Sequence, residues 1–550
     1  MRTHEVTNQV QPLEDHDVLG SDATLAEAVA QWVAPHDGSG SAALRDLGRL
    51  AGSAEARTWA DQAERVPPLL RTHAPSGARL DEVEYHPAYH RLLEVAVGAG
   101  LTAEPWQQQP GSGAHARRAA GFVVWSQVEA GHLCPVSMSY AAVPALRAAP
   151  DVAEDWVPGL AARTYDPGLA PHGRKAGLTL GMGMTEKQGG SDVRANTTRA
   201  VAAPDGPLTG ETYRLTGHKW FCSAPMSDGF LVLGQTAPGV TCFLLPRVLD
   251  DGTRNDIQVQ RLKDKLGNRS NASSEIELDE AWAVRVGDEG RGVRTIIDMV
   301  ASTRLDCILG SAATMRAALV AALHHSRHRR AFGAFLSDQP LMRNVLTDLA
   351  LESEAATLLG MRLAHAVDAG ERDLGRLGVA LGKYWVCKRT APMVAEALEC
   401  LGGNGYVEEN GLARLYREAP LNSIWEGSGN VNALDVLRAI VREPAALDAL
   451  LHELDLARGH APVLDAAIDA CRLVQDAASG PDAQWGARRL VEQLAVTLQA
   501  SLLVRFSPAP VADAFVASRL AGGHGVTFGT LGGPVGADVA PVVLDRALPA

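Results

Sequence analysis

The chain has 550 residues, of which 46% are hydrophobic and 21% charged, and its formal net charge is −13. At roughly 100–200 residues per domain, this length predicts three or four domains. The acidic balance disfavours generic nucleic-acid binding unless a local basic patch overrides it. No stretch reaches the ~20 consecutive apolar residues of a membrane helix. The N-terminus is acidic and lacks an apolar core, which fits neither a signal peptide nor a transit peptide.

Seven cysteines are scattered along the chain, at positions 134, 222, 242, 307, 387, 400 and 471. Their number is odd and no C-x-x-C motif occurs. This usage predicts reduced thiols, a cytoplasmic location and no metal site.

The first 120 residues are predicted to form helical pieces broken by polar or Gly/Pro loops, and an apolar helical stretch follows from Ala119 to Leu146 with an interruption at Cys134-Pro135. Between about 178 and 280, short β-type runs are separated by turn sequences, which predicts an antiparallel sheet. In SEIELD, Ile276 and Leu278 are expected on one face of a strand and the glutamates on the other.

After Arg291 the apolar period becomes helical: Val345, Leu346, Leu349, Ala356, Leu359 and Leu363 fall on one face, with Asp348, Glu352 and Arg362 elsewhere. The pattern as a whole predicts an α+β protein. Its expected parts are an N-terminal helical domain (1–177), a middle β domain (178–285), a C-terminal helical bundle (286–440) and an additional, mainly helical segment (441–550). The glycine-rich stretch 521–537 is expected to be a loop, a loose hairpin or disordered.

Two short motifs carry chemistry. GMGMTEKQGGSDVRANT (181–197) lacks the G-x-G-x-x-G spacing of a Rossmann site, but its small residues and exposed N–H groups can wrap a flat ring system or a pyrophosphate. The alternative is an ordinary glycine turn. NSIWEGSGNV (422–431) places Glu426 between a tryptophan and a Gly-Ser-Gly run. Its alternative is a helix start, with Ser428 or Asn430 as N-cap.

Seven segments in order resemble the acyl-CoA dehydrogenase flavoproteins. They are T-E-x-x-G-S-D with its flanks, GHKWFCS (217–223), KDKLGNRSNAS (263–273), EGRGV (289–293), RRAFG (329–333), LGGNGY (401–406) and WEGSGN (425–430). MTEKQGGSD, RLKDKLGNRSNAS, LYRE, NSIWEGSGN and QVEAGHLCP (127–135) further resemble the alkylation-response, AidB-like branch. The resemblance implies three domains, helical, β-barrel and four-helix bundle, followed here by an extra helical segment.

The resemblance also implies an FAD site between the β domain and the helical bundle. The residues it assigns to FAD are Met182, Gly183, Met184, Thr185, Gly190, Ser191, Phe221, Cys222, Ser223, Arg329, Phe332, Gln339, Gly402, Gly403, Ser428 and Asn430. Arg329, with Phe332 packed beside it, is expected to reach the FAD phosphates of a neighbouring subunit, because a guanidinium can bind two phosphate oxygens. Because the FAD site would include a residue of another subunit, the resemblance implies a homo-oligomer, assembled as a dimer of dimers. The alternative for HHSRHRR (324–330) is a solvated basic face.

For catalysis the resemblance implies that Glu426 removes the α-proton of an acyl-CoA while the β-hydride goes to flavin N5. Trp425 is expected to raise the pKa of Glu426 by burial. Trp425, Gly427 and Arg304 are expected on the substrate side, and the Glu426 N–H is expected to polarise the thioester carbonyl. A minority of relatives carry the base immediately before the arginine that matches Arg304, a slot filled here by Thr303.

Some positions depart from the family pattern: Lys187 stands for proline, Glu399 for glutamine, Trp425 for tyrosine and Asn268 for tryptophan. The loop after Phe332 also reaches its glutamine, Gln339, one residue earlier than in the family. They favour FAD binding with low turnover and a short or branched substrate. Electron-transfer flavoprotein is the expected class of electron acceptor.

A DNA-associated, alkylation-protective flavoprotein with residual dehydrogenase activity is the alternative. Residues 441–550 hold eight arginines, no lysine and twelve acidic residues, a net charge of −4. That balance opposes phosphate-driven affinity.

Overall fold

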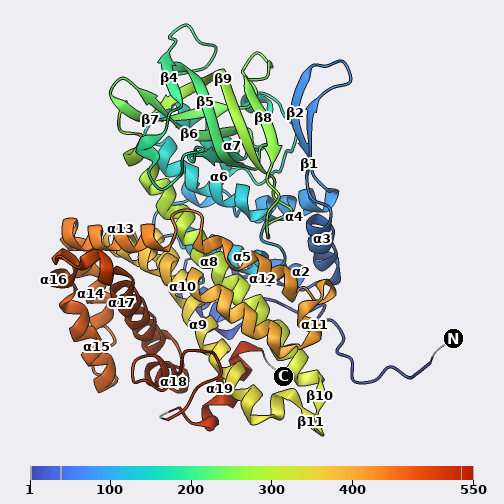
Figure 1. Cartoon of the computed structure of the whole chain (residues 1–550), viewed down its shortest axis with the longest axis vertical. Helices are drawn as coiled ribbons and strands as arrows, with labels where there is room; N and C mark the ends of the chain where they lie inside the picture. The colour runs from blue at the N-terminus through green and yellow to red at the C-terminus, as the bar shows by residue number, and fades with distance from the viewer. Residues whose placement is uncertain (1–2, 37–39, 534, 549–550) are drawn as a thin grey trace. The chain divides into compact units, whose positions relative to one another are not determined.

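The structure is a computed structural model that describes residues 3–36, 40–533 and 535–548. The chain divides into two compact units (Figure 1), each described here by itself. Unit 1 comprises residues 1–54, 110–127 and 304–550, and unit 2 comprises residues 55–109 and 128–303. The long helix α8 (Gly292–His328) begins in unit 2 and continues in unit 1.

Unit 2 is built around a seven-stranded sheet. Its strands are β3 (Leu180–Gly183), β4 (Arg199–Ala202), β5 (Thr212–Ser223), β6 (Gly229–Thr236), β7 (Gly239–Pro246), β8 (Ile257–Leu262) and β9 (Ser273–Val286). Its helices include α3 (Ala54–Arg65), α4 (Pro87–Gly98), α6 (Leu133–Leu146) and α7 (Pro150–Ala161). The pairings β4–β5, β5–β9, β9–β7, β7–β6 and β6–β4 return to their starting strand, so the sheet closes into a barrel.

Two apolar cores follow from side-chain alternation along these strands. One face of β5 to β9 fills the barrel interior with Phe230, Phe243, Ile276 and their neighbours. The opposite faces of β3, β6, β7 and β9 pack with α6, α7 and the start of α8. In the predicted SEIELD strand, Ile276 and Leu278 are buried and Glu277 is exposed, as expected. Glu275 is also buried, because Arg261 and Lys263 bind its carboxylate.

A hairpin in the N-terminal part corrects the expectation that residues 1–120 contain only helices. Strands β1 (Leu69–His73) and β2 (Arg79–Glu84) pair antiparallel, and the turn between them closes through Gly77, whose φ is +87°. The turn sequence Pro-Ser-Gly between two five- to six-residue runs was the overlooked signal.

Unit 1 is helical apart from the two-residue strands β10 (Arg330–Ala331) and β11 (Ala334–Phe335). Its longest helices are α9 (Pro340–Asp368), α10 (Arg372–Cys400) and α17 (Ala483–Phe506). The others are α1 (Ala23–Trp32), α2 (Gly40–Ala51), α5 (Ala114–Ser126), α11 (Gly403–Tyr406), α12 (Leu412–Glu418), α13 (Gly429–Arg442), α14 (Pro444–Asp455), α15 (Pro462–Arg472), α16 (Val474–Ser479), α18 (Ala509–Arg519) and α19 (Ala540–Ala547). Helix α10 packs against α9, α13, α14 and α17 (Figure 1).

Helix α9 is buried on more than the predicted apolar face. Asp348, Glu352 and Arg362, which the periodicity places off the apolar face, are buried as well. The C-terminal region covers them: Glu453 and Arg505 lie beside Arg362 in one ion network. Buried charges are retained only when paired, so these ion pairs accompany the packing of residues 441–550 on the bundle.

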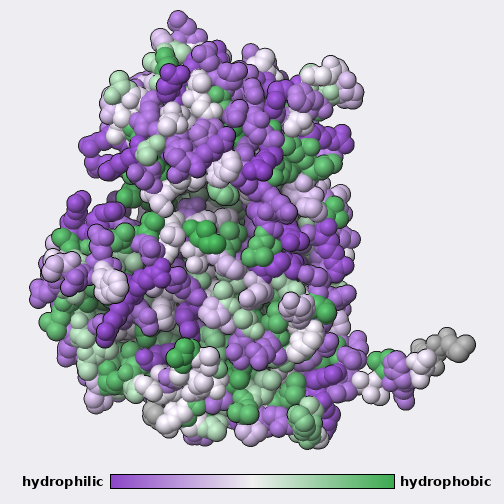
Figure 2. Space-filling model, viewed as in Figure 1, coloured by the Kyte–Doolittle hydropathy of each residue, from purple (hydrophilic) through white to green (hydrophobic). Residues whose placement is uncertain are grey.

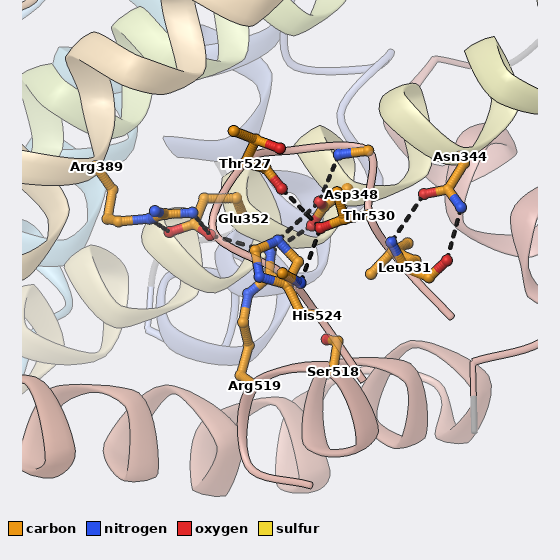
Figure 3. A network of polar contacts seen from close by, with 12 residues as sticks. Asn344, Asp348, Glu352, Arg389, Ser518, Arg519, His524, Thr527, Thr530 and Leu531 are labelled. Atoms are coloured by element: carbon orange, nitrogen blue, oxygen red, sulfur yellow. Dashed lines mark hydrogen bonds and ion pairs between the residues drawn. The ribbon is translucent and has the colours of Figure 1, made fainter. Parts of the chain in front are cut away.

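Of the predicted glycine-rich stretch 521–537, residue 534 lies outside the described residues, and residues 520–533 form a loop on α9, here called the C-terminal loop. Figure 3 shows its centre, the buried carboxylate of Asp348. Arg519 donates to Oδ1 at 2.6 Å, while His524 Nε2 and the Gly529 N–H reach Oδ2 at 2.9 and 2.8 Å. Asn344 makes two hydrogen bonds to the main chain of Leu531.

All seven cysteines are free and buried, and the described residues include no cluster of His, Cys, Asp and Glu that could hold a metal. Helix α8 has the length and composition of a membrane span, but 72% of its apolar window is buried inside the protein, as in a core helix. Figure 2 shows hydrophilic side chains mixed with smaller apolar areas on the face in view.

Candidate active site

The predicted flavin loop in unit 2 is organised by one carboxylate, Glu186. Its Oε1 accepts hydrogen bonds from Lys219 Nζ (2.8 Å) and from the N–H and hydroxyl of Thr198. Its Oε2 accepts from the N–H and hydroxyl of Thr197 and from Gln188 Nε2. Burial opposes ionisation of Glu186, but Lys219 and the other donors outweigh it and lower its pKa. The loop is therefore held by an ionised carboxylate inside the β domain.

The tip of this loop is open. Gly189, Gly190 and Ser191 are exposed, and Gly189 has a φ of +135°, a conformation that favours glycine. A Cβ on Gly190 would lie 2.3 Å from the Thr185 hydroxyl, so this position has no room for a side chain. Behind the tip, Met182 and Met184 pack against the core shared with α6 and α7, and Gly183 lies in β3.

On β5, strand alternation separates the three predicted flavin contacts. Phe221 points outward with 49% of its surface exposed. Cys222 points into the barrel core, where burial raises its pKa to about 12, so it can reach a ligand only through its main chain. The Ser223 hydroxyl lies 3.1 Å from that of Ser273. Lys263 Nζ lies 4.7 Å from the centroid of the Phe221 ring, within the range of a cation–π contact.

In unit 1, Glu426 stands on a strained turn between a short 3₁₀ turn and α13. Its φ is +56° and that of Gly427 is +94°. Both Trp425 and Glu426 are half-buried, and the Trp425 indole donates to Asn422 Oδ1 at 2.8 Å. A non-glycine residue in the left-handed region is uncommon and needs support from its surroundings.

That support comes from side chains that bind the carbonyls of the turn. Lys383 Nζ donates to the carbonyls of Trp425 (2.7 Å) and Gly427 (2.6 Å). Arg304 Nε donates to the Glu426 carbonyl at 2.9 Å and its Nη1 to Asp435 at 2.7 Å. Arg304 thus lies against the backbone of the predicted base.

The helix-start alternative is right about the position, because α13 begins directly after Ser428. Ser428 occupies the N-cap position, but its side chain makes no capping hydrogen bond, and it is exposed. Asn430 is also exposed and accepts a hydrogen bond from Arg488 Nε at 2.9 Å, from a residue of α17 in the additional C-terminal segment. The alternative base slot, Thr303, is buried, and its hydroxyl donates to the Val300 carbonyl.

The β10–β11 hairpin carries the residues predicted to reach a neighbouring subunit. Arg329 donates to the carbonyl of Asn8, and Gln339 donates to the Ala331 carbonyl across the hairpin. Phe332 at the tip is fully exposed, with a φ of +52°. The expectation that Phe332 packs beside Arg329 is therefore wrong within one chain, because the hairpin points the ring into solvent.

The glycine run before α11 leaves open space. A Cβ on Gly402 or Gly403 would meet no atom within 4 Å, whereas one on Gly405 would lie 2.1 Å from the Leu398 carbonyl. Each unit by itself offers groups whose chemical character fits FAD: unit 2 has an exposed ring at Phe221 and an open loop tip at Gly190, and unit 1 has open space at Gly402. Flat rings and pyrophosphates bind to such surfaces of apolar faces and exposed main-chain N–H groups.

Lys383 is the contributor to the site that reading the sequence missed. It stands in the apolar helical stretch GVALGKYWVCK, where a lysine is out of keeping with a buried helix face. That mismatch was the available signal.

Comparisons with known proteins agree with this architecture. Residues 8–167 match the family described as "Adaptive response protein AidB N-terminal domain". Residues 181–281 match "Acyl-CoA dehydrogenase, middle domain" and residues 290–441 match "Acyl-CoA dehydrogenase, C-terminal domain". The predicted fold, with an N-terminal helical domain, a middle β-barrel and a C-terminal helical domain, is confirmed.

Individual relatives point the same way. The chain is 44% identical over 519 residues to "Putative acyl-CoA dehydrogenase AidB" of Escherichia coli K12, covering 94% of each protein. It is 33% identical to "Acyl-CoA dehydrogenase family member 11" of Caenorhabditis elegans, over 68% of this chain and 63% of that one.

Two solved structures are also similar. "Bd2924 apo-form" aligns with a TM-score of 0.80 at 28% identity, over 91% of this chain and all of that one. C. elegans "ACDH-11 in complex with C11-CoA" aligns with a TM-score of 0.83 at 26% identity, over 99% of this chain and 93% of that one. The chain therefore belongs to the acyl-CoA dehydrogenase family, in its AidB-like branch.

Proposed function

We propose that this protein is an FAD-dependent acyl-CoA dehydrogenase in which Glu426 abstracts the α-proton of a thioester. The observation that carries the proposal is the geometry of the turn: a half-buried carboxylate on a left-handed residue, with its backbone bound by Lys383 and Arg304. A general base must be held in one place relative to the proton that it removes. With Thr303 in the other base slot, Glu426 is the proposed base.

Each residue then has a role in the reaction. Glu426 takes the α-proton, its own N–H polarises the thioester carbonyl, and Trp425 forms a wall of the acyl site. Bound FAD supplies the acceptor for the β-hydride. The proposed cofactor contacts come from the loop 182–191, Phe221, the main chain at Cys222 and Ser223, and the glycines at 402 and 403. Ser428 and Asn430 lie at the start of α13 and complete the set.

The proposed substrates are short or branched acyl-CoA thioesters, because the indole of Trp425 is larger than the phenol that relatives carry there. Thioester binding is supported by the similarity to the nematode structure, which is that of a complex with C11-CoA. A panel of acyl-CoAs from four to eleven carbons, straight and branched, separates these chain lengths.

The test is Glu426→Gln, titrated anaerobically with this panel while the flavin absorbance is followed. We expect the variant to stay yellow and to lose thioester-driven bleaching by at least about 10²-fold, the scale of general-base catalysis. Glu27→Gln, an exposed carboxylate on α1 that pairs with Arg546, is the matched control. Bleaching of Glu426→Gln at the parent rate would show that another group removes the proton.

We further propose a homo-oligomer, as a dimer of dimers, and electron-transfer flavoprotein as the electron acceptor. The fully exposed ring of Phe332 supports a partner surface at the tip of the hairpin, since burial of a large apolar side chain against a partner is favourable. Light scattering of the parent and of Phe332→Asp would measure the assembly. A parent that is monomeric would refute this part.

Nucleic-acid binding is not favoured by the C-terminal segment. Five of its eight arginines form ion pairs with acidic side chains: Arg458, Arg472, Arg505, Arg519 and Arg546. Since paired guanidinium groups are neutralised locally, few cations are left to bind phosphates. The alternative of a DNA-associated protective protein predicts salt-sensitive duplex binding by the intact chain, which a mobility-shift titration would measure.

A further inference from the structure

Four consecutive carbonyls around the proposed base accept hydrogen bonds from buried or half-buried side chains. Lys383 binds those of Trp425 and Gly427, and Arg304 binds that of Glu426. Asn432 Nδ2 donates to the Gly427 carbonyl at 2.6 Å and to the Ser428 carbonyl at 3.1 Å. The turn is therefore held from its carbonyl side.

Lys383 is unusual among these donors. It is 1% exposed, so its ammonium is shielded from water. Within the described part of the chain, its hydrogen-bond acceptors are the two carbonyls of the turn, and no ion pair joins it to a carboxylate. A buried cation without a carboxylate is costly unless local dipoles stabilise it. A neutral side chain would serve packing alone at lower cost.

The geometry of the peptide bond connects Lys383 to the chemistry. The carbonyl of Trp425 and the N–H of Glu426 belong to one planar trans peptide, in which the two groups point in opposite directions. Because the carbonyl points at Lys383, the Glu426 N–H points away from it. A cation bound to a carbonyl also withdraws electron density from the attached nitrogen and strengthens its N–H as a donor.

We propose that Lys383 is a positioning residue that aims and polarises the N–H of Glu426 toward the thioester carbonyl. The inference rests on the proposed function, and it assigns to Lys383 a part of the stabilisation of the enolate that forms when the α-proton leaves. Its contribution passes through the peptide between Trp425 and Glu426, so Lys383 itself touches neither substrate nor cofactor.

The decisive variant is Lys383→Met, which keeps the length of the side chain and removes its charge. We expect FAD content to be unchanged and thioester-driven flavin reduction at saturation to fall by roughly 10²-fold, the cost of losing an oxyanion-hole donor. A second readout is a 3-thiaacyl-CoA, which ionises at its α-carbon when bound and gives a long-wavelength band with flavin. The pH midpoint of that band should rise by about 2 units, the same factor expressed as acidity.

Hydrogen exchange of peptides that cover residues 421–432, read together with the ionisation midpoint, distinguishes the proposed role of Lys383 from a role that only supports the turn. Loss of the Lys383 hydrogen bonds should accelerate exchange there in the resting protein. Faster exchange with an unchanged ionisation midpoint would show that Lys383 only supports the turn and would overturn the proposal. Thr390→Val is the matched control, because Thr390 lies on the same helix, is 1% exposed and bonds only within α10, to the Val386 carbonyl.

The proposal can still be tested if Lys383→Met does not fold or if no thioester reduces the flavin of the parent protein. Should Lys383→Met fail to fold, Lys383→Gln keeps one donor without the charge, and parent-like reduction and midpoint in that variant would overturn the role of the charge. Should no thioester reduce the parent flavin, the proposed function fails on its own. The 3-thiaacyl-CoA band, which needs binding but no hydride transfer, then decides the role of Lys383: a raised pH midpoint in Lys383→Met supports the proposal, and an unchanged midpoint overturns it.

Discussion

Replacement of Glu186 by glutamine tests whether a single buried carboxylate holds the flavin loop. Three donors reach each of its oxygens. A glutamine side chain turns an NH₂ group toward one of these sets whichever way it is oriented, so three hydrogen bonds are lost. Lys219, whose side chain is 0% exposed, loses its charge partner at the same time.

The magnitude follows from the burial of the pair. Breaking a buried ion pair by removing one partner costs about 3–5 kcal/mol. For a unit of this size, each kcal/mol shifts Tm by roughly 2–4 °C, so Glu186→Gln should lower the Tm of unit 2 by roughly 6–20 °C. FAD retention should fall with it, because the loop 182–191 loses its support.

The assay is calorimetric unfolding together with flavin content after gel filtration. Glu211→Gln is the control, because Glu211 pairs with Arg285 in the same unit but is 66% exposed, where such pairs contribute about 0–1 kcal/mol. The double variant Glu186→Gln, Lys219→Met should recover part of the lost stability, since it leaves no unpaired charge. Equal Tm shifts for Glu186→Gln and Glu211→Gln would refute the reasoning.

Three other changes test separate parts of the molecule. Asp348→Asn should expose the C-terminal loop to limited proteolysis, whereas Asp513→Asn, at an exposed surface carboxylate, should not. Gly427→Ala forces a φ of +94° on an L-residue, which costs about 1–2 kcal/mol, and places the new Cβ in close contact with its neighbours. Flavin reduction should therefore slow. Gly375→Ala, whose Cβ would have open space around it, should leave flavin reduction unchanged. Burial opposes ionisation of Glu129, but hydrogen bonds and charge from its neighbours lower its pKa from 4.5 to about 2. Its contribution to stability is thus present above about pH 4.5 and lost as pH falls toward 2, and Glu129→Gln should flatten that limb of the acid-unfolding curve.

What the sequence determined by itself was local or carried by ordered motifs. Strand β9 was predicted from the alternation at Ile276 and Leu278, and helix α9 from the helical period between Val345 and Leu363. Both predictions were possible because period 2 and period 3.6 follow from backbone geometry alone. The order of the seven motifs indicated the family and led to the prediction that Glu426 is the base. The turn Pro-Ser-Gly of β1–β2 was equally local and was overlooked.

What only the tertiary structure decided depends on residues far apart in the chain. Lys383 lies 42 residues before Trp425, and Arg304 lies 122 residues before Glu426, so nothing in the local pattern connects them. The local pattern did not reveal the burial of Asp348 and Glu352, because their partners, Arg519 and His524, come more than 160 residues later. The sequence pattern alone does not show whether a charged residue is buried. Only the fold shows which charged side chains are paired.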